Sequence, residues 1–155
     1  RLLGFKLPEN FNAPYLKANL TQFWNNWHIT LTQWFRAYFF NPFTRFLRGN
    51  KKLPIWIIIL VTQVSTMVLI GLWHGITLNF VVWGLWHGLG LFIQNRWSGL
   101  MLPFRTRWLT TPIRQKAADF LGMVVTFNFV ALGWVFFGFP SLQTSWFIFQ
   151  RLFGL

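Results

Sequence analysis

The stretch IWIIILVTQVSTMVLIGLW, residues 55–73, decides the fold because it contains no charged side chain. Nineteen residues at about 1.5 Å per residue span roughly 28 Å, which is close to the hydrocarbon thickness of a bilayer. The sequence therefore predicts a transmembrane helix that ends next to His74. That histidine lies at the membrane boundary, or inside the membrane if the helix is tilted.

The overall composition also indicates a membrane protein. Of the 155 residues, 54% are hydrophobic, 21% are aromatic and only 10% are charged, whereas a soluble domain carries about 25% charged residues. Eleven residues are Trp, which is favoured where a bilayer meets water. No cysteine is present, which excludes disulfides, thiolate nucleophiles and cysteine-based metal sites. We expect the lipid bilayer to be the principal surroundings of the chain.

The net charge of +12 comes from 14 basic residues and two acidic ones, Glu9 and Asp119. Nucleic-acid binding is not predicted, because the basic residues flank apolar runs and no recognised binding motif accompanies them. Retention of the basic segments on the cytoplasmic membrane face explains the charge better. The predicted location is the cell membrane, plasma or inner, with several passes.

The predicted fold class is all-α: a polytopic membrane helix bundle with three to four spanning helices and an amphipathic or interfacial motif helix. We treat residues 1–155 as a single membrane domain that is expected to be a fragment of a larger protein. Its segments are a connector over 1–18, a motif helix over 19–41 that Pro42 ends, spans over 55–73, 76–93 and 118–139, and a further amphipathic or spanning element over 141–155.

Basic residues flank the first two predicted spans but do not interrupt them. No Lys or Arg occurs between Pro54 and Gln94. The positive-inside rule therefore places both flanking segments in the cytoplasm and the turn near His74 on the opposite side. The flanking basic residues are Arg45, Arg48, Lys51 and Lys52 before the spans, and Arg96, Arg105, Arg107, Arg114 and Lys116 after them.

The tetrapeptide Leu-Trp-His-Gly occurs twice, at residues 72–75 and 85–88. An ionisable side chain inside a membrane is costly, so each histidine is a candidate functional residue. A neutral imidazole can accept a proton from an attacking hydroxyl, and His74 is well placed for that role. The alternative is that His74 only donates a hydrogen bond to a neighbouring helix. On one continuous helix His87 would lie about 220° around and roughly 20 Å along from His74. It is therefore expected to be structural, or to line a different part of the cavity.

Other chemistries have little support in this inventory. The three histidines, His28, His74 and His87, lie on separate segments, so no metal site is predicted. Glu9 and Asp119 lie in a connector and at the edge of a span, and so do not suggest a glycosidase pair. Spacing alone leaves the role of His28 open.

Three ordered blocks resemble the membrane-bound O-acyltransferase (MBOAT) family, in the bacterial branch that acetylates alginate and other exported polysaccharides or D-alanylates teichoic acids. The similarity covers roughly residues 1–95. The blocks are RLLGF at 1–5 with PENF at 8–11, then FWNNWHITLTQWFRAY at 23–38, then GLWHG at 71–75 followed by Asn79, Phe80, Trp83, Gly84, His87 and Gly88.

The resemblance implies an all-helical enzyme built around a tunnel through the membrane. It implies that His74 is catalytic and that His28 is the second functional histidine. If His28 approaches His74 in the fold, we expect it to orient the donor or stabilise the oxyanion, with Asn79 as a weaker candidate for that task. The substrate-binding candidates are Trp73, Asn79, Trp27, Arg36, Tyr38 and His87. No bound cofactor is expected. The donor is an acetyl-CoA or acyl carrier protein thioester, the acceptor is a polysaccharide or teichoic acid, and an extracytoplasmic acyltransferase is a further partner.

The chain also departs from the family pattern. Asn25 and Asn26 stand where the family commonly has two arginines, and Ala37 stands where it has an aspartate able to pair with Arg36. The family's chains have many more spans, so this one is expected to be a fragment or a truncated copy. Two alternatives therefore stay open: an inactive structural fragment, and a segment of a proton-coupled transporter in which His74 and His87 relay protons.

Overall fold

The computed structural model describes residues 4, 7–139 and 141–154, and throughout these residues the regular elements are helices. This confirms the all-α fold class. The elements are η1 (Pro14–Leu16), α1 (Leu20–Asn26), α2 (Ile29–Phe35), η2 (Arg36–Phe40), α3 (Asn41–Arg48), α4 (Ile55–His74), α5 (Leu78–Trp108), α6 (Pro112–Gly138) and α7 (Leu142–Phe153).

Two helices of the described chain, α4 and α6, are long and apolar enough to cross a membrane. The second predicted span, 76–93, lies inside the much longer α5, which is not among these helices. Its interior carries polar side chains such as His87 and Gln94, and it packs against both α4 and α6. By length and hydropathy, α4 and α6 thus correspond to the first and third predicted spans, whereas the second predicted span is part of a longer and more polar helix.

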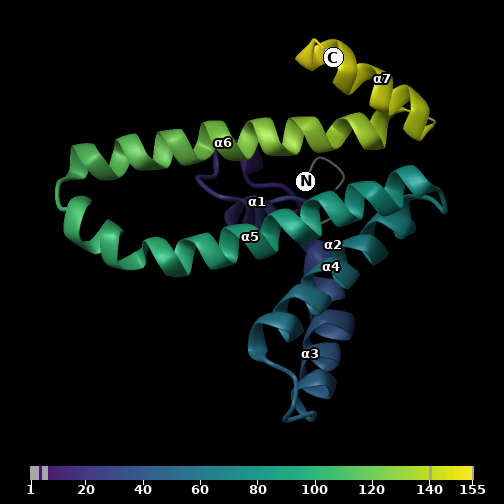
Figure 1. Cartoon of the computed structure of the whole chain (residues 1–155), viewed down its shortest axis with the longest axis horizontal. Coiled ribbons are helices and arrows are strands. Elements are labelled where there is room, and N and C mark those ends of the chain that lie inside the picture. Colours follow the sequence, from purple (N-terminus) through teal and green to yellow (C-terminus); the bar gives the residue numbers. More distant parts are fainter. Residues whose placement is uncertain (1–3, 5–6, 140, 155) are drawn as a thin grey trace.

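Helices α4 and α5 form a closely packed hairpin, as predicted, with its turn at residues 75–77. Gly84 and Gly88 of α5 face the backbone of α4: a Cβ added at Gly84 would lie 2.5 Å from Val68 Cα, and one at Gly88 would lie 2.6 Å from Val64 Cα. Small residues four apart are typical of membrane helices whose backbones approach closely. From the turn the two helices diverge, so that their basic far ends lie well away from it (Figure 1).

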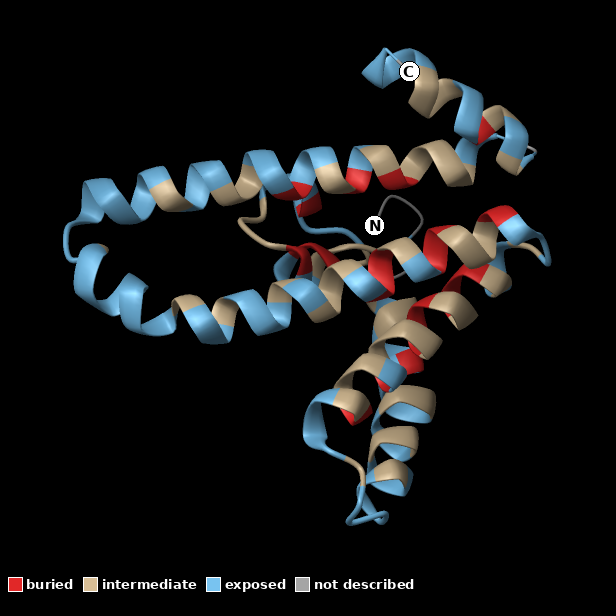
Figure 2. Cartoon of the chain, viewed as in Figure 1, coloured by how far each residue is buried: buried red, intermediate tan, exposed pale blue. Residues whose placement is uncertain are grey.

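The packing centre of the molecule lies where α1 meets α4, α5 and α6. Helices α5 and α6 run antiparallel, and α1 packs against α5 (Figure 1). Buried residues gather there, whereas the distant halves of α5 and α6 are exposed (Figure 2). The buried apolar cluster consists of Leu20, Phe23, Trp24, Phe35, Met67, Ile70, Trp83 and Val130. The family motif on α1 and α2 is thus held against the hairpin.

The motif segment is not the single helix predicted over 19–41. It breaks at His28, whose backbone is left-handed with φ +43° and ψ +54°. Helix resumes at Ile29, widens to a π-helix over Arg36–Phe40, and continues through α3. Pro42 lies in the first turn of α3 and does not end the helix. The π-helical widening directly precedes this proline, whose missing N–H and bulky ring disturb regular α-helical bonding.

The connector, predicted over 1–18, docks onto the motif; residues 1–3 and 5–6 lie outside the described residues. Asn10 provides two acceptors for the start of α2. Its backbone oxygen accepts a hydrogen bond from Ile29 N at 2.9 Å, and its Oδ1 accepts from Thr30 N at 3.1 Å and Thr30 Oγ1 at 2.9 Å. An unpaired N–H at a helix start needs such an acceptor. Asn10 therefore caps α2 from a distant position in the sequence.

Candidate active site

His74 is the last residue of α4, and its ring lies among aromatic side chains from three helices. The ring centroids are 4.8 Å from Trp73, 4.9 Å from Phe137, 6.0 Å from Trp83 and 6.1 Å from Phe80. We call these five residues the His74 cluster. Its open side leaves the His74 side chain exposed. The imidazole is therefore held by apolar rings but remains accessible to a substrate.

Gly75 permits this arrangement. A Cβ added there would lie 2.6 Å from Cε2 of Phe80, which is shorter than any normal contact. Phe80 therefore approaches the turn, and stacks near His74, only because residue 75 has no side chain.

Trp73 links the two histidines that the family resemblance singled out. Its ring lies perpendicular to His74 at 4.8 Å and perpendicular to His28 at 5.9 Å. His28 Nδ1 is buried and has no hydrogen-bond partner among the described residues. A buried polar atom without a partner is uncommon and needs an explanation, and a bound ligand is one. The fold thus brings His28 and His74, from separate segments, to one exposed indole.

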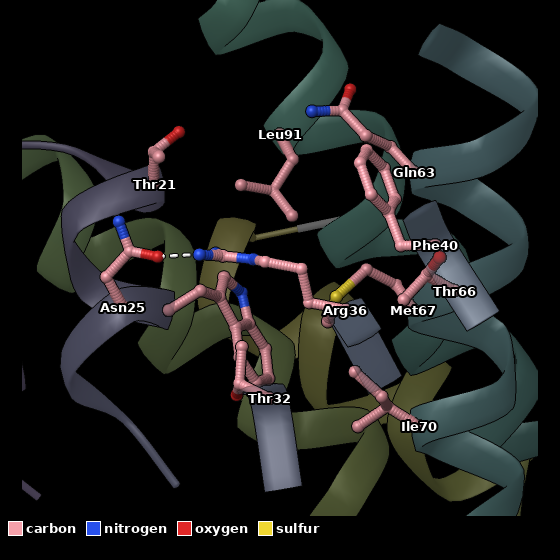
Figure 3. A pocket seen from close by; sticks show the side chains of 11 residues that line it. Thr21, Asn25, Thr32, Arg36, Phe40, Gln63, Thr66, Met67, Ile70 and Leu91 are labelled. Atoms are coloured by element: carbon pink, nitrogen blue, oxygen red, sulfur yellow. Dashed lines mark hydrogen bonds between the residues drawn. The ribbon is translucent and has the colours of Figure 1, made fainter. Parts of the chain in front are cut away.

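A cavity of about 240 Å³ lies beside Arg36, between α1, η2, α4 and α5 (Figure 3). Arg36 Nη2 donates a hydrogen bond to Asn25 Oδ1 at 2.6 Å. Neither of the chain's two carboxylates lines this cavity, so the Arg36 charge faces no anion there. We call it the Arg36 cavity. Its polar lining is Thr21, Asn25, Thr32, Arg36, Gln63 and Thr66, and its apolar lining is Trp24, Phe40, Met67, Ile70 and Leu91.

The Arg36 cavity lies along α4 on the basic-end side of His74. Its lining on that helix runs from Gln63 to Ile70. At about 1.5 Å per residue, Ile70 lies roughly 6 Å and Gln63 roughly 16 Å before His74 along the axis. The cavity and the His74 cluster therefore lie at successive positions along α4, with the cavity nearer the basic end.

His87 is fully buried and does not line this cavity. Its Nδ1 accepts a hydrogen bond from Trp24 Nε1 at 3.3 Å, and its Nε2 has no partner among the described residues. The spacing estimate based on one continuous helix does not apply, because the chain reverses between the two histidines. As a result Trp83 touches both, with centroids 4.8 Å from His87 and 6.0 Å from His74.

Three other predicted substrate-binding residues have different surroundings. Asn79 is buried, and its Nδ2 donates to Phe139 O at 2.7 Å and Ser145 Oγ at 3.5 Å, so its amide ties α5 to the start of α7. Trp27 stacks on Phe23 at 5.5 Å and does not line the Arg36 cavity. Tyr38 is 70% exposed on the outer side of η2. The structure does not bring these three side chains to the Arg36 cavity.

Gln63 is a cavity residue that the sequence reasoning did not select. Its neighbours on α4, Thr62, Ser65 and Thr66, donate their hydroxyls to carbonyls of the same helix. Gln63 Oε1, in contrast, is buried without a partner among the described residues. A polar amide in an uncharged span was the available signal, since such residues commonly face an internal site.

No group of three metal-ligating side chains gathers within the described part of the chain. The described His, Asp and Glu side chains therefore do not form a cluster with the three or four ligands usual for zinc.

Residues 2–138 match the MBOAT, membrane-bound O-acyltransferase family. The chain therefore belongs to this family, and the resemblance identified from its motifs is confirmed.

Several curated relatives are cell-envelope enzymes by name. The chain is 34% identical over 153 residues to the probable alginate O-acetylase AlgI of Pseudomonas aeruginosa, covering 99% of the chain and 26% of the relative. It is 33% identical over 152 residues to the peptidoglycan O-acetyltransferase of Helicobacter pylori, covering 98% and 26%. It is 31% identical over 140 residues to the teichoic acid D-alanyltransferase of Bacillus subtilis, covering 88% and 33%. The chain thus spans about a quarter to a third of the length of these relatives.

Proposed function

We propose that this chain is the histidine-bearing part of a multi-pass O-acyltransferase of the cell membrane, plasma or inner. The enzyme moves a short acyl group, acetyl in our first choice, from a cytoplasmic thioester to hydroxyls of an exported polysaccharide. D-Alanine on teichoic acid is the alternative pair of substrates. One observation carries the proposal: His28 and His74 meet at Trp73 beside an open aromatic cluster, in a chain of the MBOAT family.

In the proposed reaction His74 acts as general base. It accepts the proton of the acceptor hydroxyl while the hydroxyl oxygen attacks the thioester carbonyl carbon. The tetrahedral intermediate then collapses, the carbon–sulfur bond breaks, and the thiolate takes the proton from His74 to leave as a thiol. The products are the ester and the free thiol, and His74 is neutral again.

His28 is proposed to serve the carbonyl end of the same reaction. Its unpartnered Nδ1 can donate a hydrogen bond to the oxyanion if that nitrogen carries the proton, or accept one from the thioester donor if it does not. The rings of the His74 cluster shield one side of the reacting atoms from water, which favours transfer over hydrolysis.

The Arg36 cavity is the proposed approach of the donor. Coenzyme A and the prosthetic arm of an acyl carrier protein both carry phosphate, which a guanidinium binds well. Their amide-containing chain also suits a lining that mixes polar and apolar side chains, including the unpartnered Gln63 Oε1. The acceptor, and an extracytoplasmic acyltransferase acting with it, would then meet the His74 cluster from the opposite side.

The test uses the full-length protein in sealed proteoliposomes of known orientation. Labelled acetyl-CoA, or a labelled acyl carrier protein in a second arm, is supplied on one side and the polysaccharide on the other, and the arrangement is then reversed. We expect transfer only with the donor on the side of Lys52 and Arg105. Equal transfer in both arrangements would remove the directional mechanism, and no transfer in any arrangement would overturn the proposed function.

A further inference from the structure

Trp24 lies between the two regions described above. Its side chain lines the Arg36 cavity, and it is only 5% exposed. Its ring is perpendicular to that of Trp83 at 5.8 Å, and Trp83 in turn belongs to the His74 cluster. The Trp24 indole is therefore a wall of the cavity on one side and a support of the cluster on the other.

The orientation of this wall depends on His87. Trp24 Nε1 can only donate a hydrogen bond, and it donates to His87 Nδ1 at 3.3 Å. The two rings are perpendicular at 5.3 Å. Because Nδ1 must supply a lone pair, the imidazole is neutral and carries its proton on Nε2. A doubly protonated ring would lose this bond.

The other surroundings of His87 favour the same neutral form. Its ring packs against Trp83 of α5 and Phe129 of α6, and Nε2 faces Gly133, where an added Cβ would lie 2.8 Å away. None of these groups is charged or titratable. An imidazolium at this position would be buried without a counter-charge, which is strongly unfavourable.

We infer that His87 is a positioning residue that acts through Trp24: it holds the indole as the wall between the Arg36 cavity and the His74 cluster. Its lone pair is committed to Trp24, so it is not available as a base. The kinetic part of this inference rests on the proposed function, because it takes the cavity to be the donor's approach. The hydrogen bond and the tautomer do not depend on that function.

The kinetic test compares four variants of the full-length enzyme. His87→Leu removes the acceptor, Trp24→Phe removes the donor, a double variant removes both, and His87→Gln restores an amide oxygen as acceptor. We expect each of the first two to raise the donor KM about tenfold, with kcat nearly unchanged, as for loss of a buried hydrogen bond. The double variant should be no worse than either single one, and His87→Gln should recover most of the loss. Additive losses, or a fall in kcat at constant KM, would overturn the inference.

A spectroscopic test examines the wild-type side chains and does not require measurable activity. The full-length protein is labelled with ¹⁵N-histidine, and the signals of His87 are identified by their loss in His87→Gln. We expect the Nε2-protonated neutral tautomer at every pH between about 5 and 8, the range in which an ordinary histidine titrates. Titration in that range, or a proton on Nδ1, would refute the inference. If acyl transfer is absent but the tautomer is as expected, the proposed function fails while the positioning bond stands.

Discussion

The two copies of Leu-Trp-His-Gly have the same four residues but opposite surroundings. In the first copy, His74 ends a helix, lies against aromatic rings and stays accessible. In the second copy, His87 lies inside α5, fully buried, with Nδ1 bonded to Trp24. A free lone pair and access to substrate are required of a base, and only the first copy combines an exposed ring with a nearby second histidine.

The difference arises from packing beyond the tetrapeptide. After the first copy the chain leaves the helix at Gly75, whereas after the second copy Gly88 lies against Val64 and the helix continues. The glycine of the tetrapeptide thus follows the end of a helix in the first copy and allows close contact with a neighbouring helix in the second. The local sequence identifies candidate residues, but the partners supplied by α1 and α6 determine what each histidine can do.

The largest expected effect is the loss of activity when His74 is replaced. In the full-length enzyme His74→Gln should lower acceptor acylation about 100- to 10,000-fold, because removal of a general base typically costs that much. Initial rates with saturating donor measure the effect.

Ser65→Ala on the same helix is the matched control, since among the described residues the Ser65 hydroxyl bonds to carbonyls of its own helix. It should retain activity. If His74→Gln kept more than half of the wild-type rate at normal protein levels, the assignment of His74 as the base would be wrong.

The glycines of the two copies should differ in stability. Gly88→Ala forces a Cβ against the backbone of α4 and should lower the free energy of unfolding by about 1–3 kcal/mol, as overpacking does. Gly75→Ala meets the Phe80 ring, which can rotate or shift, so its cost should be smaller. Denaturant unfolding in detergent measures both. An equal or larger loss for Gly75→Ala would show that the turn, not the helix contact, is the tighter site.

The Arg36 cavity gives a third, smaller contrast. Arg36→Gln should raise the donor KM about tenfold through loss of a charged hydrogen-bond donor, and should leave kcat with saturating donor close to normal. Arg45→Gln, an exposed arginine of α3 outside the cavity, is the control. Equal effects of the two changes would mean that general surface charge, not the cavity, binds the donor.

The smallest expected effect concerns topology. Single cysteines at Lys52 and Arg105 should react with a membrane-impermeant thiol reagent from the same side, because no basic residue lies between Pro54 and Gln94. A cysteine at Ile76, which is 93% exposed at the turn, should not react from that side. Activity should be unaffected by the first two changes. Labelling of Lys52→Cys and Arg105→Cys from opposite sides would break the hairpin topology.

The helical class, the α4–α5 hairpin and the family were predictable because they depend on hydropathy, charge and local motifs. The break at His28 was not, since the residues around it are all compatible with helix and the acceptor for α2 comes from Asn10. The length of α5 was also missed. The predicted span ended at residue 93 with a basic cytoplasmic segment after it, but the helix continues through that segment to Trp108.

At the candidate site, the sequence indicated His74, His28 and Arg36. In the structure His74 lies in the His74 cluster, His28 packs against Trp73, and Arg36 lines the cavity. The sequence could not reveal the hydrogen bonds of Asn79, because the partners of this side chain lie about sixty residues downstream, at Phe139 and Ser145. The role of His87 was open for the same reason. Its partner Trp24 is on another segment, and no periodicity links the two.

The cap that Asn10 places on α2 has a consequence for the timing of synthesis. The acceptor is twenty residues upstream of Thr30, so a ribosome adding about 5–20 residues per second makes it one to four seconds earlier. When the first turn of α2 emerges, the group that completes it is already present. The cap of the segment that carries His28 therefore does not have to wait for the hairpin that carries His74 to be made.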